Sequence, residues 1–212
     1  PTDTISISID KDAVLRSGIM LPDSIRHLKG KELKNAIPDK IYISLKDMRI
    51  LTKVDMLMLE MLANCNWERP LYMAISVGEV SKLKFDHYFV QEGLAFRFTP
   101  FDYKKWGNVK GDNNYAIDVE RLYENVMNRY KYGGLDTPGL YLDETTLRTC
   151  YYHRRLFAQL AKELIRQGDN TRARKVLAYA EQAVPAYNVP EIYESGSFDI
   201  AKAYAALGEK TK

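Results

Sequence analysis

The sequence lacks the features that mark several large classes of protein. It has 2 cysteines and 8 prolines in 212 residues, too few for a disulfide scaffold or a low-complexity chain. No apolar run approaches the ~20 residues that span a bilayer. No GxGxxG, GxxxxGK[ST], HExxH or CxxC motif occurs. The sequence therefore carries no signature of a dinucleotide, nucleoside-triphosphate or zinc site.

A strong excess of one charge is also missing. The chain has 31 basic and 28 acidic residues, a net charge of +3, and so nucleic acid is not expected as a partner. Hydrophobic residues make up 46% and charged residues 28%, as in a soluble globular protein. The length allows one large domain or two small ones.

Tyrosine, in contrast, is abundant, with 15 residues against 7 Phe and 2 Trp. Amphipathic rings often mark binding surfaces. Cys65 and Cys150 stand far apart in the sequence, and two free buried thiols are favoured over one disulfide. The chain starts at Pro1 without a methionine or a signal peptide, which favours a processed product or a piece of something longer.

The segment from Thr4 to Val77 predicts strands and one helix. Thr4–Asp10 has isoleucines at alternate positions, and Lys40–Leu45 is a second strand candidate. Residues 11–40 are expected to be irregular, with at most a short helix near Ile25–Leu33. Leu71–Val77 is a continuous apolar run that predicts a buried strand.

A helix is expected between the second and third of these strands. Thr52 and Asp55 form a capping-box pattern at its start. An apolar stripe of helical spacing follows, made of Val54, Leu57, Met58, Met61 and Leu62. Strand, helix and strand at this spacing predict a right-handed βαβ crossover.

Two further elements are expected before residue 144. Leu94–Thr99 reads as a strand, and a helix should follow Asp118, which is a good N-cap residue. Tyr130 lies on the core stripe of that helix. Gly133-Gly134 stops it.

From Thr145 onward only helices are expected, and their pattern is tetratricopeptide-like. Large and small residues follow the template across two helices joined by Gln167-Gly168-Asp169: Phe157, Leu160, Ala161 and Leu164, then Ala173, Leu177, Ala180 and Pro185. The pattern then restarts near the end of the chain, with Ile200-Ala201 and Tyr204 in the places of Leu160-Ala161 and Leu164. An array this short cannot bury a solenoid core alone, so it should dock on the preceding part.

The predicted fold is therefore α+β or α/β. A small sheet domain that contains a βαβ unit should occupy residues 1–143. A truncated array of tetratricopeptide-like helical hairpins should occupy residues 144–212.

The helical part is also the basic part. Residues 145–212 hold 11 basic and 7 acidic residues, a net +4, which leaves −1 for residues 1–144. Aromatic residues lie among the arginines, so a basic, aromatic helix face could bind an acidic peptide, a glycan phosphate or lipid headgroups. The alternative is a solvated face whose side-chain stems pack on the core. The candidate contact residues are Tyr151, Tyr152, Arg154, Arg155, Tyr187 and Tyr193.

Trp67 and Arg69 are two further candidates, in the segment that joins the helix to the third strand. Ligands in α/β crossovers favour loops at the carboxyl ends of strands, and this loop enters a strand at its amino end. A structural role for the pair is therefore favoured over ligand contact.

No catalytic residue, metal ligand or cofactor is predicted. Cys150 and His153 stand one helical turn apart. However, a mid-helix cysteine lacks the helix N-terminus or sharp turn that activates a nucleophile. A glycan-acting enzyme remains the alternative, and it would need two carboxylates in one cleft, drawn from Glu68, Glu92 and Asp143.

Three segments in series also carry a resemblance to a known family: NCNWERPLYMAISVG, EGLAFRFTP and VMNRYKYGGLDTPGLYLDE. From about Leu51 to Lys212, and only loosely over Pro1–Lys40, the chain resembles the C-terminal soluble region of a bacterial multi-pass membrane-protein family. That family is similar to glycosyltransferase-C enzymes and to the transmembrane protein O-mannosyltransferase.

The resemblance implies a domain on the extracytoplasmic, periplasmic face of a bacterial membrane, tethered through upstream membrane segments absent from this chain. Glycosyltransferase-C enzymes place their catalytic carboxylate between early membrane helices, and so no catalytic residue is expected here. The implied function is a non-catalytic accessory domain that binds an acceptor protein, another partner, a glycan or its own membrane half. The alternative is a free-standing cell-envelope enzyme acting on a glycan.

Overall fold

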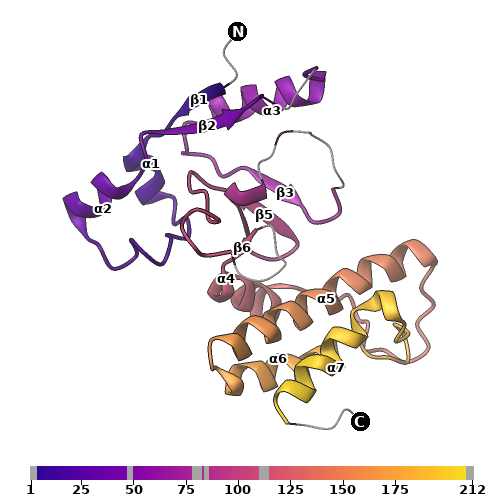
Figure 1. Ribbon diagram of the computed structural model, residues 1–212. Coiled ribbons are helices and arrows are strands. Elements are labelled where there is room, and N and C mark those ends of the chain that lie inside the picture. Colours follow the sequence, from indigo (N-terminus) through magenta and orange to yellow (C-terminus); the bar gives the residue numbers. More distant parts are fainter. Residues whose placement is uncertain (1–3, 47–49, 78–82, 84–85, 110–114, 209–212) are drawn as a thin grey trace. The chain divides into compact units, whose positions relative to one another are not determined.

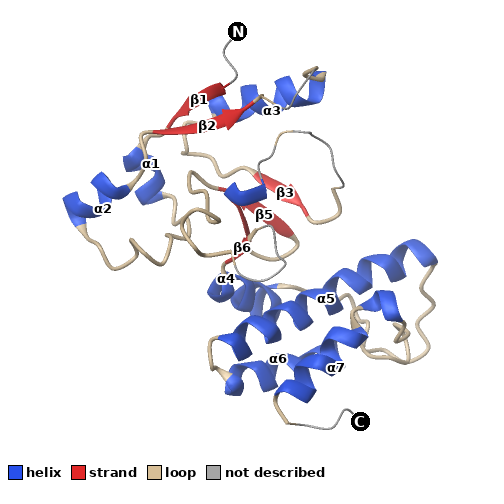
Figure 2. Cartoon of the chain, in the orientation of Figure 1, coloured by secondary structure: helices blue, strands red, loops and turns tan. Residues whose placement is uncertain are grey.

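The computed structural model describes residues 4–46, 50–77, 83, 86–109 and 115–208 (Figure 1). The chain divides into two compact units, Pro1–Asp118 (unit 1) and Val119–Lys212 (unit 2). Among the described residues, strands occur only in unit 1, and unit 2 is helical (Figure 2). The mixed α+β class with a C-terminal helical hairpin is the predicted one.

The units divide earlier in the chain than the sequence predicts. The predicted boundary follows Asp143, whereas the observed one follows Asp118. The intervening residues include helix α4 (Val119–Glu124), which packs against the long helix α5 (Glu144–Arg166). Leu122 and Val126 are buried there, and so this segment belongs to the helical core.

A two-stranded antiparallel sheet opens unit 1. Strand β1 (Thr4–Ser8) pairs with β2 (Lys40–Ser44), and Ile7 lies opposite Ile41. Both strands alternate: Ile7, Ile41 and Ile43 are buried and Ile5 is half-buried, while the polar side chains and Tyr42 are exposed. This pairing corrects the predicted βαβ crossover, because β2 finds its partner in the equally amphipathic β1 and not in the strand that follows the helix.

Two short helices connect these strands, where irregular chain is predicted. Helix α1 (Lys11–Arg16) is capped by Asp10, whose carboxylate accepts from the backbone N–H groups of Asp12 and Ala13, each at 3.0 Å. Its buried face holds Ala13 and Val14. Helix α2 (Gly30–Ala36) has no fully buried residue.

The second sheet has four short strands in the order β3-β5-β4-β6. They are β3 (Tyr72–Ala74), β4 (Phe89–Gln91), β5 (Ala95–Phe98) and β6 (Ala116–Ile117), with β4 and β6 parallel and the other pairs antiparallel. The 3-10 turn η1 (Asp86–Tyr88) leads into β4. The predicted buried strand at Leu71–Val77 is shorter and lies at the sheet edge, where Tyr72 is half exposed.

Helix α3 (Lys53–Asn64) begins with the predicted capping box. The Thr52 hydroxyl accepts from the backbone N–H of Asp55 at 3.2 Å, and the Asp55 carboxylate accepts from the backbone N–H of Thr52 at 2.8 Å. The predicted core stripe is only partly correct. Leu62 is buried and Met58 partly buried, whereas the other three members, Val54, Leu57 and Met61, are exposed.

Unit 2 is built on a hairpin of α5 and α6 (Asn170–Ala183). Asp143 and Asp169 cap the two helices, and Gly168 adopts a φ of +82° in the turn between them. The small and large residues of the tetratricopeptide-like pattern lie buried along both helices. A hairpin is therefore confirmed, while membership of the tetratricopeptide class stays a prediction.

Helix α7 (Ser197–Ala206) contacts both helices of the hairpin, after a 3-10 turn η3 (Tyr193–Ser195). Gly196 joins the two with a φ of +86°. A Cβ atom on this glycine would lie 2.9 Å from Cγ of Arg155 and 3.1 Å from its backbone nitrogen. Only glycine lets the η3–α7 corner approach α5 this closely.

Candidate functional site

The eight candidate contact residues fall in different units. Trp67 and Arg69 lie in unit 1, and the other six lie in unit 2. They therefore form separate surfaces. Of the six in unit 2, three lie in one exposed patch, one is buried, and one fixes a loop through a hydrogen bond.

Trp67 is a structural residue of unit 1. Its ring is buried and stacked on Phe98, with centroids 5.8 Å apart, and its indole N–H donates to the carbonyl of Ser8 at 3.1 Å. These contacts hold it at a φ of +61°, unusual for a side chain of this size. Trp67 thus ties the two sheets of unit 1 together, as the sequence favours.

Arg69 is exposed and lines a small cavity beside Trp67. That cavity has a volume of about 10 Å³, which is room for about one water molecule. It is too small for an organic ligand. The cavity lined by Trp67 and Arg69 is therefore not a binding pocket for such a ligand.

Arg154 is buried, with only 4% of its surface exposed. Its guanidinium donates to the carbonyls of Val184, Val189 and Pro190 at 3.1, 2.5 and 3.0 Å and to the Ser197 hydroxyl at 3.3 Å. Burial lowers the pKa of this group. The prediction of Arg154 as a surface contact is corrected: it fixes the segment that leads from α6 to α7.

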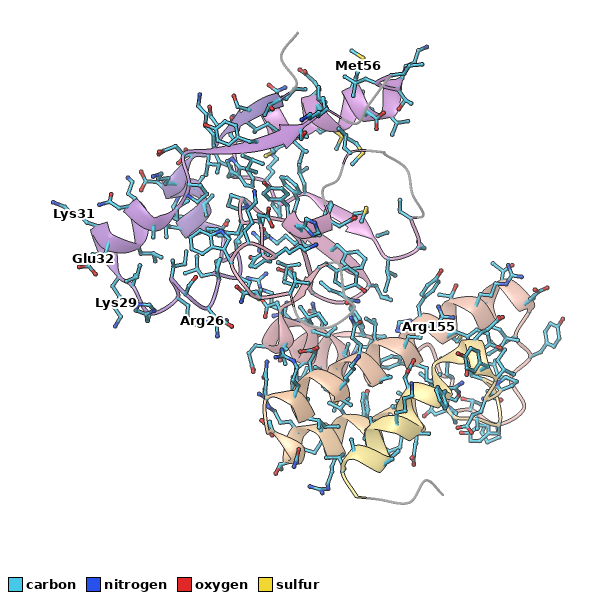
Figure 3. All side chains as sticks on the ribbon, viewed as in Figure 1. Arg26, Lys29, Lys31, Glu32, Met56 and Arg155 are labelled. Atoms are coloured by element: carbon cyan, nitrogen blue, oxygen red, sulfur yellow. The ribbon has the colours of Figure 1, made fainter. Side chains whose placement is uncertain are left out.

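Arg155, the next residue, lies on the surface of α5 and is labelled in Figure 3. Its guanidinium stands over the ring of Tyr152, 5.6 Å from the centroid, and donates to the carbonyl of Glu194. Glu194 follows Tyr193 in the turn η3. Arg155 thus links Tyr152 on α5 to the turn that carries Tyr193, and three of the predicted contact residues come together there.

Helix α7 extends this surface with two residues that sequence reasoning missed. The Tyr193 ring lies 5.9 Å from that of Phe198, and the ammonium group of Lys202 lies 4.2 Å above the Phe198 ring. Tyr193 is 83% exposed and Phe198 is 49% exposed. We name this surface the aromatic–basic patch: Tyr152, Arg155, Tyr193, Phe198 and Lys202.

The remaining two candidates have other contacts. Tyr151 is half-buried on α5. The Tyr187 hydroxyl donates to the carbonyl of Asp136 at 2.6 Å. The neighbouring Asn188 amide donates to the carbonyls of Leu135 and Thr137 at 2.7 and 2.6 Å. Tyr187 therefore helps to fix the loop that precedes α5, although its ring remains exposed.

A larger hollow in unit 2 was not predicted. It has a volume of about 680 Å³, within the range of small-molecule sites. We name it the tyrosine groove; its principal residues are three tyrosines and three polar side chains, namely Tyr130, Tyr132, Tyr179, Asn128, Asp136 and Gln182. Gly133 and Gly134 also line it, with φ values of +61° and +75°.

The tyrosines of the groove are packed against one another and against α5. The Tyr132 ring lies 6.0 Å from Tyr179, 5.6 Å from Phe157 and 5.2 Å from His153, while Tyr130 lies 6.1 Å from the same histidine. Burial lowers the pKa of His153 and raises that of Tyr132. Both side chains are therefore uncharged at neutral pH.

Two of the three carboxylates of the enzyme alternative have structural partners. Glu92 is buried, accepts from the Tyr72 hydroxyl at 2.8 Å and lies 3.6 Å from the Arg97 guanidinium. Asp143 caps α5, and Glu68 is exposed. Of the two hollows described above, one is lined by a carboxylate, Asp136.

The Cys150 thiol does not resemble an activated nucleophile either. Cys65 and Cys150 are both free, and burial raises the pKa of Cys150, whereas a reactive cysteine needs a lowered one. Within the described ranges, no group of His, Cys, Asp or Glu side chains could hold a metal ion. Nor does any helix there combine the length and apolarity that crossing a bilayer requires.

These features define a mixed α+β chain with an exposed aromatic surface and an aromatic groove on its helical unit. The chain belongs to the family of the TMEM260-associated domain 2, whose family model matches residues 1–120. No curated protein and no solved structure matches the chain.

The family match covers a different part of the chain from the motif resemblance. It includes Pro1–Lys40, which the sequence motifs covered only loosely, and it spans all of unit 1. Two of the three motif segments lie inside it. The third, at residues 126–144, and nearly all of unit 2 lie outside it.

Proposed function

We propose that the chain is a non-catalytic accessory domain of a membrane glycosyltransferase-like protein, on the extracytoplasmic side, and that it binds an acceptor protein through the aromatic–basic patch. The family name supports an association with a transmembrane protein. The motif resemblance to glycosyltransferase-C-related proteins supports the kind of parent.

The patch is the observation that carries the binding role. Tyr193 and Phe198 expose adjacent rings, and Ile192 next to them is 44% exposed. Tyrosine and arginine are the residues that most often dominate binding energy at protein interfaces. Contiguous exposed aromatic surface is costly to leave in water, and on small domains it commonly marks an interaction site.

Several contacts hold the backbone that carries Tyr193 and Phe198. Arg155 fixes η3 by donating to the Glu194 carbonyl, and Gly196 lets the corner rest on α5. The buried Arg154 holds the preceding segment. Because the backbone of this corner is already held in place, binding a partner would cost little backbone entropy. The glycan-acting enzyme would need two carboxylates in one cleft, and neither of the two hollows described above is lined by more than one.

Photo-crosslinking in the full-length membrane protein tests the binding role. A photoreactive phenylalanine analogue replaces Tyr193 in one variant and Tyr141 in the control, since both tyrosines are more than 80% exposed in unit 2. We expect a discrete adduct with an acceptor protein from position 193 and none from position 141. Equal adducts from both positions, or none from either, would contradict the proposal.

Cysteine labelling tests the location. In a background with Cys65 and Cys150 replaced by alanine, Tyr141→Cys supplies one exposed thiol. A membrane-impermeant maleimide should label this thiol in cells with a permeabilised outer membrane and an intact inner membrane. Labelling only after the inner membrane is broken would place the domain in the cytoplasm and overturn this part of the proposal.

A further inference from the structure

We propose that the tyrosine groove of unit 2 binds an uncharged oligosaccharide. The inference goes beyond the proposed function, because its residues are not those of the aromatic–basic patch. Four features of the groove suit such a ligand: its size, its fixed aromatic surface, its planar polar side chains and its lack of net charge.

The aromatic surface is fixed by contacts inside unit 2. The Tyr132 hydroxyl donates to the carbonyl of Val126 at 2.6 Å, and its ring packs edge-on against Tyr179 with an interplanar angle of 77°. The hydroxyl of Tyr132 is therefore already used, and what this residue can offer a ligand is its ring. Sugar rings carry C–H groups on their faces, which make weak favourable contacts with aromatic faces.

Polar groups suited to hydroxyls surround these rings. Asn128 and Gln182 carry amides, which both donate and accept, and Asp136 carries a carboxylate, which accepts. The Asn128 amide also donates one hydrogen bond to the Glu124 carboxylate at 2.6 Å, which leaves it a second N–H and its oxygen. All three side chains are exposed. Vicinal sugar hydroxyls present donor and acceptor atoms at the spacing of such planar groups, so one amide can hold two of them.

The loop that carries Asp136 is held in place. Asn188 donates to the carbonyls of Leu135 and Thr137, and Tyr187 donates to that of Asp136. Gly133 and Gly134 supply the left-handed backbone that turns the chain along the groove. A ligand would therefore meet a preformed site, which lowers the entropic cost of binding.

The charges of the lining argue against anionic ligands. Its two charged residues, Lys131 and Asp136, cancel. Phosphate-rich or nucleic-acid ligands are bound by clusters of Lys and Arg, and arginine is absent from this lining. A neutral saccharide fits this balance.

A proline-rich peptide is the other ligand that aromatic grooves accept. Its backbone carbonyls only accept hydrogen bonds, so they cannot use the amide oxygens of Asn128 and Gln182 or the carboxylate of Asp136. Sugar hydroxyls both donate and accept, and they can therefore use all of these groups. The groove therefore favours the saccharide.

Titration of the isotope-labelled chain tests the proposal by NMR. The probes are three neutral tetrasaccharides (of mannose, of glucose and of N-acetylglucosamine), a phosphorylated mannose and a proline-rich decapeptide. We expect at least one neutral tetrasaccharide to shift the resonances of Tyr130, Tyr132 and Tyr179 below about 10 mM. No shift from any tetrasaccharide, tighter binding of the phosphorylated sugar, or a response to the peptide alone would overturn the proposal.

Variants show whether the groove itself is the site. Gln182→Ala and Asn128→Ala change exposed side chains and should each weaken binding by about fivefold to tenfold. Tyr179→Phe keeps the ring and should bind nearly as well as the original chain. Tyr141→Ala, at an exposed tyrosine of unit 2 outside both surfaces, is the matched control and should bind fully. Binding that survives both groove variants, or that is lost in the Tyr141 variant, would contradict the assignment.

Discussion

At the scale of single residues, the burial of Arg154 has a direct consequence for stability. Its guanidinium satisfies three backbone carbonyls between α6 and α7. Arg154→Met keeps much of the stem but leaves these carbonyls without this donor. We expect a loss of about 2–3 kcal/mol in the free energy of unfolding, measured by urea denaturation.

Arg148 on the same helix is the matched control. It is exposed and pairs with Glu144 at 2.5 Å, and an exposed pair of this kind contributes about 0.2–1 kcal/mol. Arg148→Met should therefore cost much less than Arg154→Met. Equal losses for the two variants would mean that Arg154 does not hold the α6–α7 segment.

His153 should make unit 2 sensitive to mild acid. Burial holds the pKa of its imidazole below the ordinary value of 6.5. The unfolded chain therefore binds a proton more readily than the folded one, and stability should fall as the pH drops below about 6.5. His153→Phe should flatten this dependence between pH 7.5 and 5.5 in urea denaturation, whereas His27→Phe, at an exposed position, should retain it. A steep slope that persists without His153 would assign the effect to another group.

Contacts between residues far apart in the sequence decide which parts of the candidate site can be predicted from the sequence. Arg154 and Arg155 are adjacent and equally basic, so composition cannot say which one points inward. The answer depends on backbone carbonyls beyond the end of α6, far from both arginines in the sequence. The tyrosine groove combines side chains from the segment before α5 with side chains from the end of α6, and no local periodicity links them. Only the tyrosine excess hinted at such a surface.

At the scale of elements, the start of α3 is set by its capping box. Thr52 and Asp55 exchange bonds with each other's backbone N–H groups at 3.2 and 2.8 Å. Thr52→Ala should lower the free energy of unfolding of unit 1 by about 1 kcal/mol and speed hydrogen exchange in the first turn of α3. Lys53→Ala, at the exposed first position of the helix, should change neither. An unchanged exchange rate in the Thr52 variant would contradict the role of the cap.

Elements defined by local chemistry were predicted well, and pairings between distant elements were not. The cap of α3, the strands β1 and β2 and the α5–α6 hairpin all follow from residues close in sequence. The pairing of β2 with β1 does not follow from nearby residues, because any strand with one apolar face could pair with β2. The same limit applies to α3: a stripe of helical spacing predicts a helix, but the surrounding elements decide how much of the stripe is buried. Here Leu57 of the stripe is 65% exposed, and Met56, which precedes it outside the stripe and is labelled in Figure 3, is 61% exposed.

At the scale of the whole molecule, the boundary between units can be tested by dividing the chain. Residues 119–143 supply buried side chains to the helical core, among them Leu122, Val126 and Leu135. Arg172 on α6 also binds Glu120 through two bonds of 2.8 Å. The fragment 119–212 should therefore fold with a cooperative thermal transition and dispersed NMR signals. The fragment 144–212, cut at the boundary that the sequence predicts, should expose that core and lose cooperativity, because it lacks the α4 layer. Equal cooperativity of the two fragments would show that α4 contributes little to the helical core and would restore the boundary after Asp143.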